Sequence, residues 1–485
     1  MATSVSSDDS SADALTEYER QRLENVKRNQ ALIAALGIQH VKAEIQQQSA
    51  SKKADHKGYK KSADKRARER EEPIVTRRLR SSRVSWTSED AEKLGNPPSP
   101  EPVKDLFKVE DKRKSLNILS TCVRQSSTEN FLERLRNFDD QVPLAQVCTF
   151  KRRKREHGDI GPNDLSLHKT DIARVVPGRI MSVAFLPIND FLLVVAGDKF
   201  GHLGFWEVES RDEDGDGVNI FQPHSAPVSG VAVQPPGATK ICMFIQVLTC
   251  SYDGTVKRLD VEISMFDLMY SLDNDDIFSA ICTVPGSTNC AYVAEGSGTL
   301  KMLDVREKKF SSSGLFHQRR INTIDISKQS PWLMVTASTD TDVSVWDVRK
   351  MKKSRDRIGH VQHKKAVHSA YFSPSGSTIA TCSYDNTIAL YKVLTNEQPV
   401  YIAHPNMNNR WISTFRAIWG WNDRHVFVGN MKRTIDVIST ELAAECSWLS
   451  SPLMTSIPCR LATHPSRPGV LAGCSAGGQV YVWRK

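Results

Sequence analysis

The chain has 485 residues, of which 39% are hydrophobic, and it carries a formal net charge of +9 at pH 7. This length allows one large hydrophobic core beside a long polar region, so we expect two parts of different composition. The longest apolar stretches, such as Ile241–Cys250, are much shorter than the roughly 20 residues of a membrane-spanning helix, which excludes helical membrane insertion.

The first part, residues 1–165, is rich in Ser, Lys, Glu and Gln and poor in alternating apolar residues, so we expect most of it to be disordered. One helix is predicted near residues 15–36. Thr16 and Glu19 form a capping box, Gly37 can terminate the helix, and its apolar residues fall mainly on one side. This apolar stripe either binds a partner or packs on the chain's own folded domain.

Basic residues are concentrated in two clusters of this region. Residues 52–83 contain 13 Lys and Arg against 5 Asp and Glu, so 13 − 5 gives a charge of +8. A second cluster, Lys151, Arg152, Arg153, Lys154 and Arg155, has the density of a nuclear localisation signal. Clusters of this kind attract polyanions, of which nucleic acid is the leading candidate, or an import receptor. We therefore expect a nuclear protein.

Residues 166–485 contain an internal repeat. Alternating strands close on a Trp-Asp-like pair seven times, at intervals of 53, 44, 43, 45, 46 and 46 residues; the pairs begin at Trp206, Leu259, Leu303, Trp346, Tyr391, Val437 and Trp483. A period of roughly 40–45 residues with such pairs is typical of propeller blades. The sequence therefore predicts an all-β fold, a seven-bladed WD-repeat β-propeller with a largely disordered basic N-terminal region.

Two details of the repeats carry structural predictions. Lys485 follows the third strand of the last blade, so an outer strand is missing, and we expect Leu167–Val176 to supply it. This places the start of the domain near residue 165. His224, His317 and His363 each lie four residues before a first strand, where a WD repeat usually has a His bonded to the turn Asp.

Motifs of catalysis or metal binding are weak. Gly473–Gly477 matches G-x-S-x-G, but a strand follows it where a hydrolase needs a helix. The acidic residues 212–217 imitate a calcium loop, yet its twelfth position is Pro223 instead of Glu. The ten cysteines form no C-x-x-C pair. We therefore expect a monomeric protein that is no enzyme and has no catalytic residue, metal or cofactor.

Positive residues recur where the innermost strands begin, in five of the seven blades: Arg179, Arg319, Arg320, Lys364, Lys365, Arg410 and Arg460. At this position they would surround one mouth of the central channel and bind the phosphates of DNA; otherwise they form a solvated rim. Trp411 is next to Arg410 and either stacks on a base or belongs to the core.

The segment Leu333–Arg349 reads LMVTASTDTDVSVWDVR. It resembles the DWD box of WD-repeat proteins that dock on the damaged-DNA-binding subunit one, the adaptor of cullin 4 ubiquitin ligases. The resemblance implies that Trp346, Asp347 and Arg349 bind the adaptor, with Arg349 reaching it. Leu303-Asp304-Val305-Arg306 is a weaker copy without the Trp.

Residues 18–29, YERQRLENVKRN, and residues 410–419, RWISTFRAIW, together resemble the WD repeat domain 76 family, relatives of the damaged-DNA-binding WD-repeat subunit. The resemblance implies a nuclear protein that binds DNA with some preference for damaged duplex and associates with chromatin proteins and the cullin 4 adaptor. The alternative hypothesis is a protein-only chromatin scaffold whose basic rim binds acidic partners.

Overall fold

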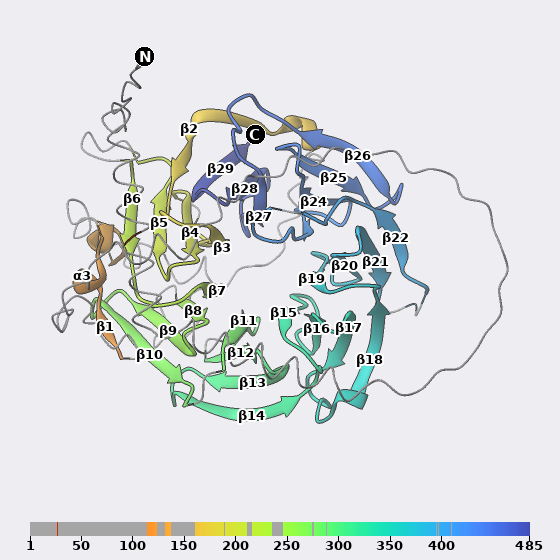
Figure 1. Cartoon of the computed structure of the whole chain (residues 1–485), viewed down its shortest axis with the longest axis horizontal. Coiled ribbons are helices and arrows are strands. Elements are labelled where there is room, and N and C mark those ends of the chain that lie inside the picture. Colours follow the sequence, from red (N-terminus) through yellow and green to blue (C-terminus); the bar gives the residue numbers. More distant parts are fainter. Residues whose placement is uncertain are drawn as a thin grey trace, which may run out of the picture. The chain divides into compact units, whose positions relative to one another are not determined.

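In the computed structural model, the described residues are 27, 114–123, 131–136, 161–188, 190–210, 216–234, 246–273, 276–287, 289–393, 395, 397–408 and 410–485. They form seven antiparallel sheets around a central axis (Figure 1). This confirms the prediction of a seven-bladed, all-β propeller. The basic clusters at 52–83 and 151–155 lie outside the described residues, as does the predicted helix near 15–36 apart from the helical Lys27.

Each blade is described here from its innermost strand outwards. Blade 1 contains β3 (Ile180–Phe185), β4 (Leu193–Asp198), β5 (Leu203–Glu207) and β6 (Val218–Phe221). Blade 2 contains β7 (Val228–Gln234), β8 (Gln246–Ser251), β9 (Thr255–Asp260), β10 (Met265–Ser271) and the additional β1 (Leu116–Asn117). Blade 3 contains β11 (Phe278–Thr283), β12 (Cys290–Glu295), β13 (Thr299–Asp304) and β14 (Lys309–Leu315).

Blade 4 contains β15 (Ile321–Ile326), β16 (Leu333–Ser338), β17 (Asp342–Asp347) and β18 (Arg357–Gln362), the last preceded by the 3-10 turn Ser354–Asp356. Blade 5 contains β19 (Val367–Phe372), β20 (Thr378–Ser383), β21 (Thr387–Lys392) and β22 (Val400–Ala403). Blade 6 contains β23 (Ile418–Trp419), β24 (His425–Gly429), β25 (Ile435–Ser439) and β26 (Ala444–Leu449).

Blade 7 joins the two ends of the propeller. It contains β27 (Pro458–Thr463), β28 (Val470–Ser475) and β29 (Gln479–Arg484), and its outer strand is β2 (Ser166–Arg174), which follows the 3-10 turn Pro162–Asp164. Ser166 pairs with Arg484 and Arg174 pairs with Gln479, in antiparallel register. The predicted strand donation is therefore confirmed, and the ring is closed by hydrogen bonds between segments far apart in the sequence.

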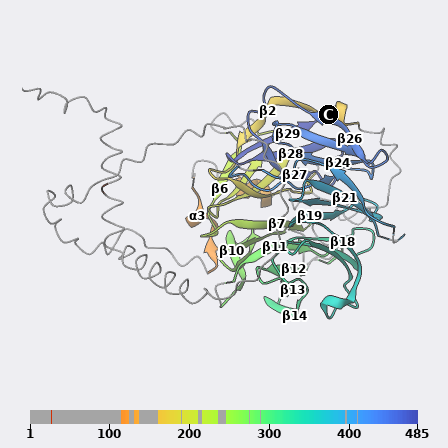
Figure 2. The same cartoon turned by 45° about the vertical axis from the view of Figure 1, so that its right-hand side comes forward.

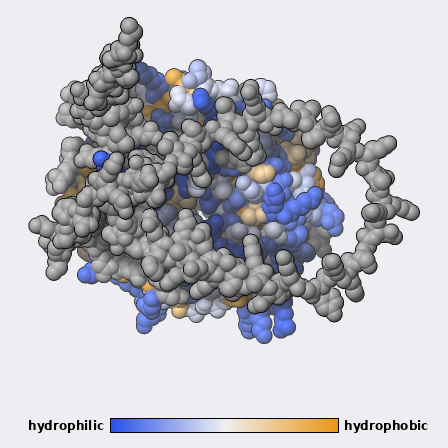
Figure 3. Space-filling view, in the orientation of Figure 1, coloured by the Kyte–Doolittle hydropathy of each residue, from blue (hydrophilic) through white to orange (hydrophobic). Residues whose placement is uncertain are grey.

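The core lies between neighbouring blades. Every residue of β4 and of β16 is buried, because each middle strand packs against a blade on either side. Such strands have apolar or small residues on both faces, which explains their near-continuous apolar runs. The outermost strands face solvent instead, as in β14, where most residues are exposed. On the visible part of the surface, hydrophilic residues predominate and hydrophobic residues form only small separate groups (Figure 3).

The folded part of the chain begins upstream of the expected boundary near residue 165. Strand β1 pairs with β10, and the short helix α3 (Ile118–Thr121) follows at once, capped by the Asn117 side chain, which accepts the Leu119 N–H at 2.8 Å. Cys122 then forms a β-bridge with Phe221 of β6. This segment thus covers the outer strands of blades 1 and 2 (Figures 1 and 2).

Apolar anchors explain why this upstream segment folds onto the propeller. Ile118 is fully buried in a cluster that includes Phe221 and Phe266. Helical residues 131–136 add Phe131 and Leu132 to the same cluster. The composition of the sequence does not reveal these few apolar residues, because they lie within a polar, charged region.

Candidate nucleic-acid interface

The propeller has two faces, which the strand order defines. Adjacent strands are antiparallel, so the loop before each first strand and the turn between the second and third strands lie on one face, which we call the entry face. The loop after each first strand and the loop between the third and fourth strands lie on the opposite face, the exit face. The predicted basic rim belongs to the entry face, whereas Arg349 belongs to the exit face.

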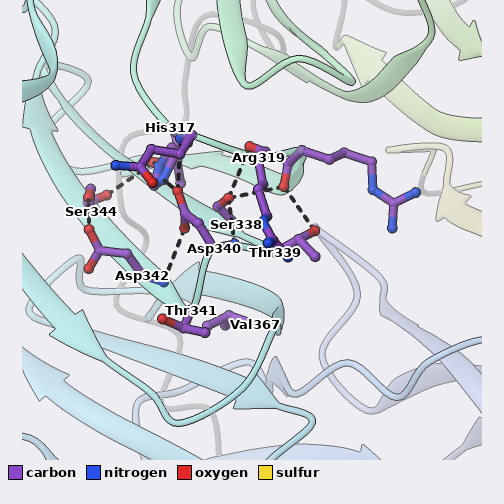
Figure 4. A network of polar contacts seen from close by, with 12 residues as sticks. His317, Arg319, Ser338, Thr339, Asp340, Thr341, Asp342, Ser344 and Val367 are labelled. Atoms are coloured by element: carbon purple, nitrogen blue, oxygen red, sulfur yellow. Dashed lines mark hydrogen bonds and ion pairs between the residues drawn. The ribbon is translucent and has the colours of Figure 1, made fainter. Parts of the chain in front are cut away.

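Hydrogen bonds hold the rim loop of blade 4 in place (Figure 4). His317 Nδ1 lies 3.1 Å from the Asp340 carboxylate, and the same carboxylate accepts the Gln318 N–H at 3.1 Å. Ser338 Oγ donates to the backbone carbonyls of Arg319 and Arg320. Although burial opposes ionisation of Asp340, its bond to His317 holds the pKa of this carboxyl at about 2. The loop that carries the two arginines is therefore fixed to the blade.

The same His–Asp pairing occurs in other blades. His224 Nδ1 lies 3.0 Å from Asp253 in blade 2, and His363 Nδ1 lies 3.2 Å from Asp385 in blade 5. These contacts confirm the structural role predicted for the three histidines. A fourth pair, His404 and Asp436 in blade 6, was not predicted from the sequence, since the residues between His404 and the first strand of that blade form an irregular segment instead of a short loop.

Four of the predicted rim cations are exposed on the entry face: Arg319, Lys364, Lys365 and Arg410. They belong to blades 4, 5 and 6, which are consecutive in the ring. Lys365 Nζ lies 5.6 Å from the centre of the Tyr384 ring. None of the four forms an ion pair with a carboxylate of the described residues. We call these four exposed cations on consecutive blades the basic arc.

Two other predicted cations are half-buried beside the channel. Arg320 donates from Nη1 to the Tyr252 hydroxyl at 3.1 Å and from Nε to Asn322 Oδ1 at 3.2 Å. Arg179 lies in blade 1, and its Nε is buried without a hydrogen-bond partner among the described residues. Both side chains are thus less exposed than the four cations above.

Arg460 does not belong to the rim. It is the third residue of β27, whereas the aligned cations precede their strands, and it is only 5% exposed. Its Nε donates to the Met181 carbonyl at 2.8 Å, and its Nη1 donates to the Thr414 carbonyl. Burial, together with the nearby Arg416, lowers the pKa of Arg460 to about 9. The predicted ring of phosphate contacts is therefore incomplete at blade 7.

Trp411 is 94% exposed, so it is not a core residue. It follows Arg410 in a tight turn in which the Ile412 N–H donates to the Arg410 carbonyl at 2.9 Å. A large aromatic ring held out in water at the end of the basic arc is available to stack on a base or to contact a partner.

Two further exposed cations, which the start positions of the first strands did not predict, lie in the same blade as Arg410. Lys432 and Arg433 occupy the turn between β24 and β25 of blade 6, and Arg433 has a positive φ of 64°. Turns between the second and third strands lie on the same face as the starts of the first strands, so cations in these turns join the same surface.

Blade 3 interrupts the positive charge of the entry face. The loop before β11 carries Asp273 and Asp276 instead of cations. The charged side chains at these positions are therefore basic in blades 4 to 6 and acidic in blade 3. A polyanion is expected to follow the basic arc and to avoid blade 3.

On the exit face, the predicted adaptor residues differ in how far they are exposed to solvent. The Arg349 side chain is 62% exposed; its Nε and Nη2 donate to the two Asp347 oxygens at 2.9 and 2.7 Å. Its guanidinium also lies 5.2 Å from the ring centre of Trp332, which is 42% exposed. The bond from Arg349 holds the pKa of Asp347 at about 2. Trp346, in contrast, is fully buried and cannot contact a partner in this fold.

The remaining motifs show no catalytic arrangement. Ser475 is buried, and its Oγ accepts the backbone N–H groups of Gly477 and Gln479 at 3.3 and 3.2 Å. No group of three His, Cys, Asp or Glu side chains suited to a metal ion occurs in the described ranges. Of the helices that the structure describes, none has the length and apolar character needed to cross a membrane.

The chain is also similar in sequence to known proteins. The family model described as WD domain, G-beta repeat matches residues 215–258, 311–347 and 355–392, which fall mainly in blades 2, 4 and 5. WD repeat-containing protein 76 of Xenopus laevis is 30% identical over 486 residues, covering 97% of this chain and 80% of that protein. DNA damage-binding protein CMR1 of Phaeosphaeria nodorum is 25% identical over 531 residues, covering 97% and 98% respectively. WD repeat-containing protein 76 of Mus musculus is 26% identical over 514 residues, covering 99% and 77%.

Proposed function

This chain belongs to the WD repeat-containing protein 76 family, and on that premise we propose that it is a nuclear DNA-binding propeller whose basic arc contacts the phosphates of duplex DNA. The observation that carries the proposal is the arc itself: Arg319, Lys364, Lys365 and Arg410 are exposed, lie on consecutive blades, and lack carboxylate partners among the described residues. Several relatives at 25 to 27% identity bear the name DNA damage-binding protein.

Phosphate contacts supply affinity and orientation without sequence specificity. Exposed lysine and arginine side chains release counterions from DNA when they bind, so the affinity falls steeply with salt. Trp411, Lys432 and Arg433 extend the arc at blade 6, and the exposed Trp411 ring supplies the aromatic surface that an unstacked or distorted base would contact. Preference for damaged duplex is therefore assigned to this end of the arc.

The test compares two variants of the full chain that have the same change in net charge. The arc variant carries Arg319→Glu, Lys364→Glu and Arg410→Glu. The control carries Lys350→Glu, Lys352→Glu and Lys353→Glu, three exposed lysines that follow β17 on the exit face. Fluorescence anisotropy with undamaged and ultraviolet-treated duplex, over a series of salt concentrations, gives the affinity and its salt dependence.

If the arc is the DNA site, the arc variant loses at least about ten-fold in affinity and its log–log salt slope falls by roughly 2 to 3, because about 0.9 of slope accompanies each phosphate contact in duplex DNA. The control keeps its affinity within about two-fold. Equal binding by both variants refutes the proposal. If the arc variant then fails to bind a polyglutamate peptide that the control binds, the protein-only scaffold with acidic partners is the correct function.

The exit face supports a second part of the proposal, the docking of the cullin 4 adaptor through Arg349. The guanidinium is held by Asp347 and stacked on Trp332, so its orientation is fixed before a partner arrives. Blade 3 offers a matched control, since within the described residues Asp304 accepts the backbone N–H groups of Arg306 and Glu307 but no hydrogen bond from the Arg306 side chain. DNA on the entry face and an adaptor on the exit face would bind at the same time.

We expect Arg349→Ala to abolish co-precipitation with the purified adaptor, while Arg306→Ala leaves it unchanged and both variants keep the DNA affinity of the wild type. Adaptor binding that survives Arg349→Ala would remove the ligase-receptor function and leave the DNA-binding function untouched.

A further inference from the structure

The central channel contains a cavity of about 610 Å³. It is lined by the first strands of the blades and by the loops that follow them, which carry Lys328, Trp421 and Pro465. These loops belong to the exit face, whereas Asn322 and Arg460, near the starts of their strands, line the same cavity, so the cavity extends along the channel from the first strands to the exit loops. Its volume is in the range of pockets that bind small molecules.

Two arginine side chains line this cavity, Arg416 and Arg460. Arg416 donates from Nη1 to the Tyr371 hydroxyl at 3.4 Å and from Nη2 to the Asn322 carbonyl at 3.3 Å. Its Nε is buried and has no hydrogen-bond partner among the described residues. Arg460 uses Nε and Nη1 for backbone carbonyls, and within the described part of the chain its Nη2 has no partner. Each guanidinium therefore retains hydrogen-bond donors that the protein does not use.

Neither arginine has a carboxylate partner in the described residues, although a buried cation normally requires a counter-charge. The charged residues of the lining are Arg416, Arg460 and Lys328 against Asp325, so 3 − 1 gives a net charge of +2. Asp325 is the acidic residue in this count; burial raises the pKa of its carboxyl to about 6, and it accepts the Phe372 N–H at 2.8 Å instead of pairing with either arginine.

The same positive charge lowers the pKa of a neighbouring histidine. Burial, together with Arg460, Arg416 and Arg320, lowers the pKa of His368 to about 3, and its Nε2 is buried without a partner among the described residues. A neutral imidazole therefore lies beside three guanidinium groups. Among the described residues, no carboxylate forms an ion pair with Arg416 or Arg460, so their unused donors are available to an anion that comes from solution.

We infer that the central channel binds a small phosphate-bearing anion between the guanidinium groups of Arg416 and Arg460. Guanidinium groups match the oxygens of phosphate in geometry and charge, and a phosphate dianion would balance the net charge of the lining. Two sources share this chemistry, free inorganic phosphate or pyrophosphate and the phosphate of a mononucleotide, and the cavity has room for either.

The test is isothermal calorimetry and thermal unfolding of the full chain with three separate probes: inorganic phosphate, pyrophosphate and adenosine monophosphate. A ligand of the folded state raises the melting temperature in a saturable way. We expect saturable binding of at least one probe, and the probe that binds most tightly identifies the source. Absence of saturable binding for all three probes overturns the inference.

Variants locate the site. Arg416→Gln removes the charge while its amide can still donate to Asn322, and we expect at least a ten-fold loss of affinity. If that variant does not fold, the exposed Lys328→Gln decides, with an expected loss of about three-fold. Arg433→Gln is the control on the entry face and should bind the probe like the wild type. A loss with Arg433→Gln, or displacement of the probe by duplex DNA, would place binding on the basic arc and overturn the channel site.

Discussion

The hydrogen-bonded network of blade 4 leads to a quantitative prediction for Thr336. This residue is fully buried; its Oγ1 lies 2.7 Å from His317 Nε2 and accepts the Trp346 Nε1–H at 2.8 Å. With His317 Nδ1–H donating to Asp340, the Thr336 hydroxyl donates to Nε2. The substitution Thr336→Val keeps the shape and leaves two buried polar groups without partners.

Each such group costs about 1–3 kcal/mol, so Thr336→Val should reduce the free energy of unfolding by roughly 2–6 kcal/mol. Thr249→Val in blade 2 is the matched control. Thr249 Oγ1 bonds His224 Nε2 at 2.9 Å, but Leu259 occupies the place of the Trp, so one side-chain partner is lost instead of two. The control should therefore cost roughly 1–3 kcal/mol.

The assay is urea unfolding of the full chain, followed by circular dichroism, with both variants and the wild type compared at a common slope. Because His317 also fixes the loop before β15, Thr336→Val should weaken DNA binding more than Thr249→Val at equal temperature. A cost for Thr336→Val no larger than that for Thr249→Val would refute the argument, since it would mean that the indole N–H contributes nothing.

Three further predictions concern single side chains. In the folded protein His368 has a pKa of about 3, against 6.5 for the free side chain, so below pH 6.5 only the unfolded state takes up this proton and the free energy of unfolding falls. His368→Gln should reduce this loss of stability between pH 7 and 5.5 by about 1 kcal/mol, measured by urea unfolding. An unchanged loss would refute the assignment. Trp411→Ala should change stability by less than about 0.5 kcal/mol because the ring is exposed, yet weaken DNA binding several-fold in anisotropy; equal binding would remove the stacking role. With iodoacetamide at pH 8, the exposed Cys446 should be alkylated first among the described cysteines. Burial raises the pKa of Cys250 and of Cys382 to about 12, so both should stay unmodified in peptide mass spectra. Rapid labelling of either thiol would contradict its burial.

Much of the fold follows from the sequence because each blade repeats the same pattern of alternating strands and Trp-Asp-like endings. The closing strand was predictable for the same reason: a blade with three strands requires a fourth. The packing of residues 114–123 and 131–136 was not predictable, because Ile118, Phe131 and Leu132 are isolated apolar residues in a polar region, and only the fold brings them into one cluster with Phe221 and Phe266.

The candidate site was predicted less completely. The sequence identified cations at the starts of the first strands, but it could not distinguish the exposed Arg319 from the buried Arg460. Arg319 precedes its strand and reaches water, whereas Arg460 is the third residue of β27 and lies in the channel. Exposure of Trp411 likewise depends on an irregular turn, for which the residue pattern of blade 6 offers no signal.

The segment that covers blades 1 and 2 determines how the propeller can be isolated for experiment. A truncated chain that begins at Leu165 would lack β1, α3 and residues 131–136, and would leave the outer edges of β6 and β10 open. It would also uncover the apolar surface beneath Ile118, Phe131 and Leu132, a loss of roughly 5–9 kcal/mol at about 1.5–3 kcal/mol for each buried side chain. Exposed edges and apolar surface together promote aggregation. Aggregation of such a chain would therefore mean that part of the domain is missing. A soluble propeller should begin upstream of Ser115.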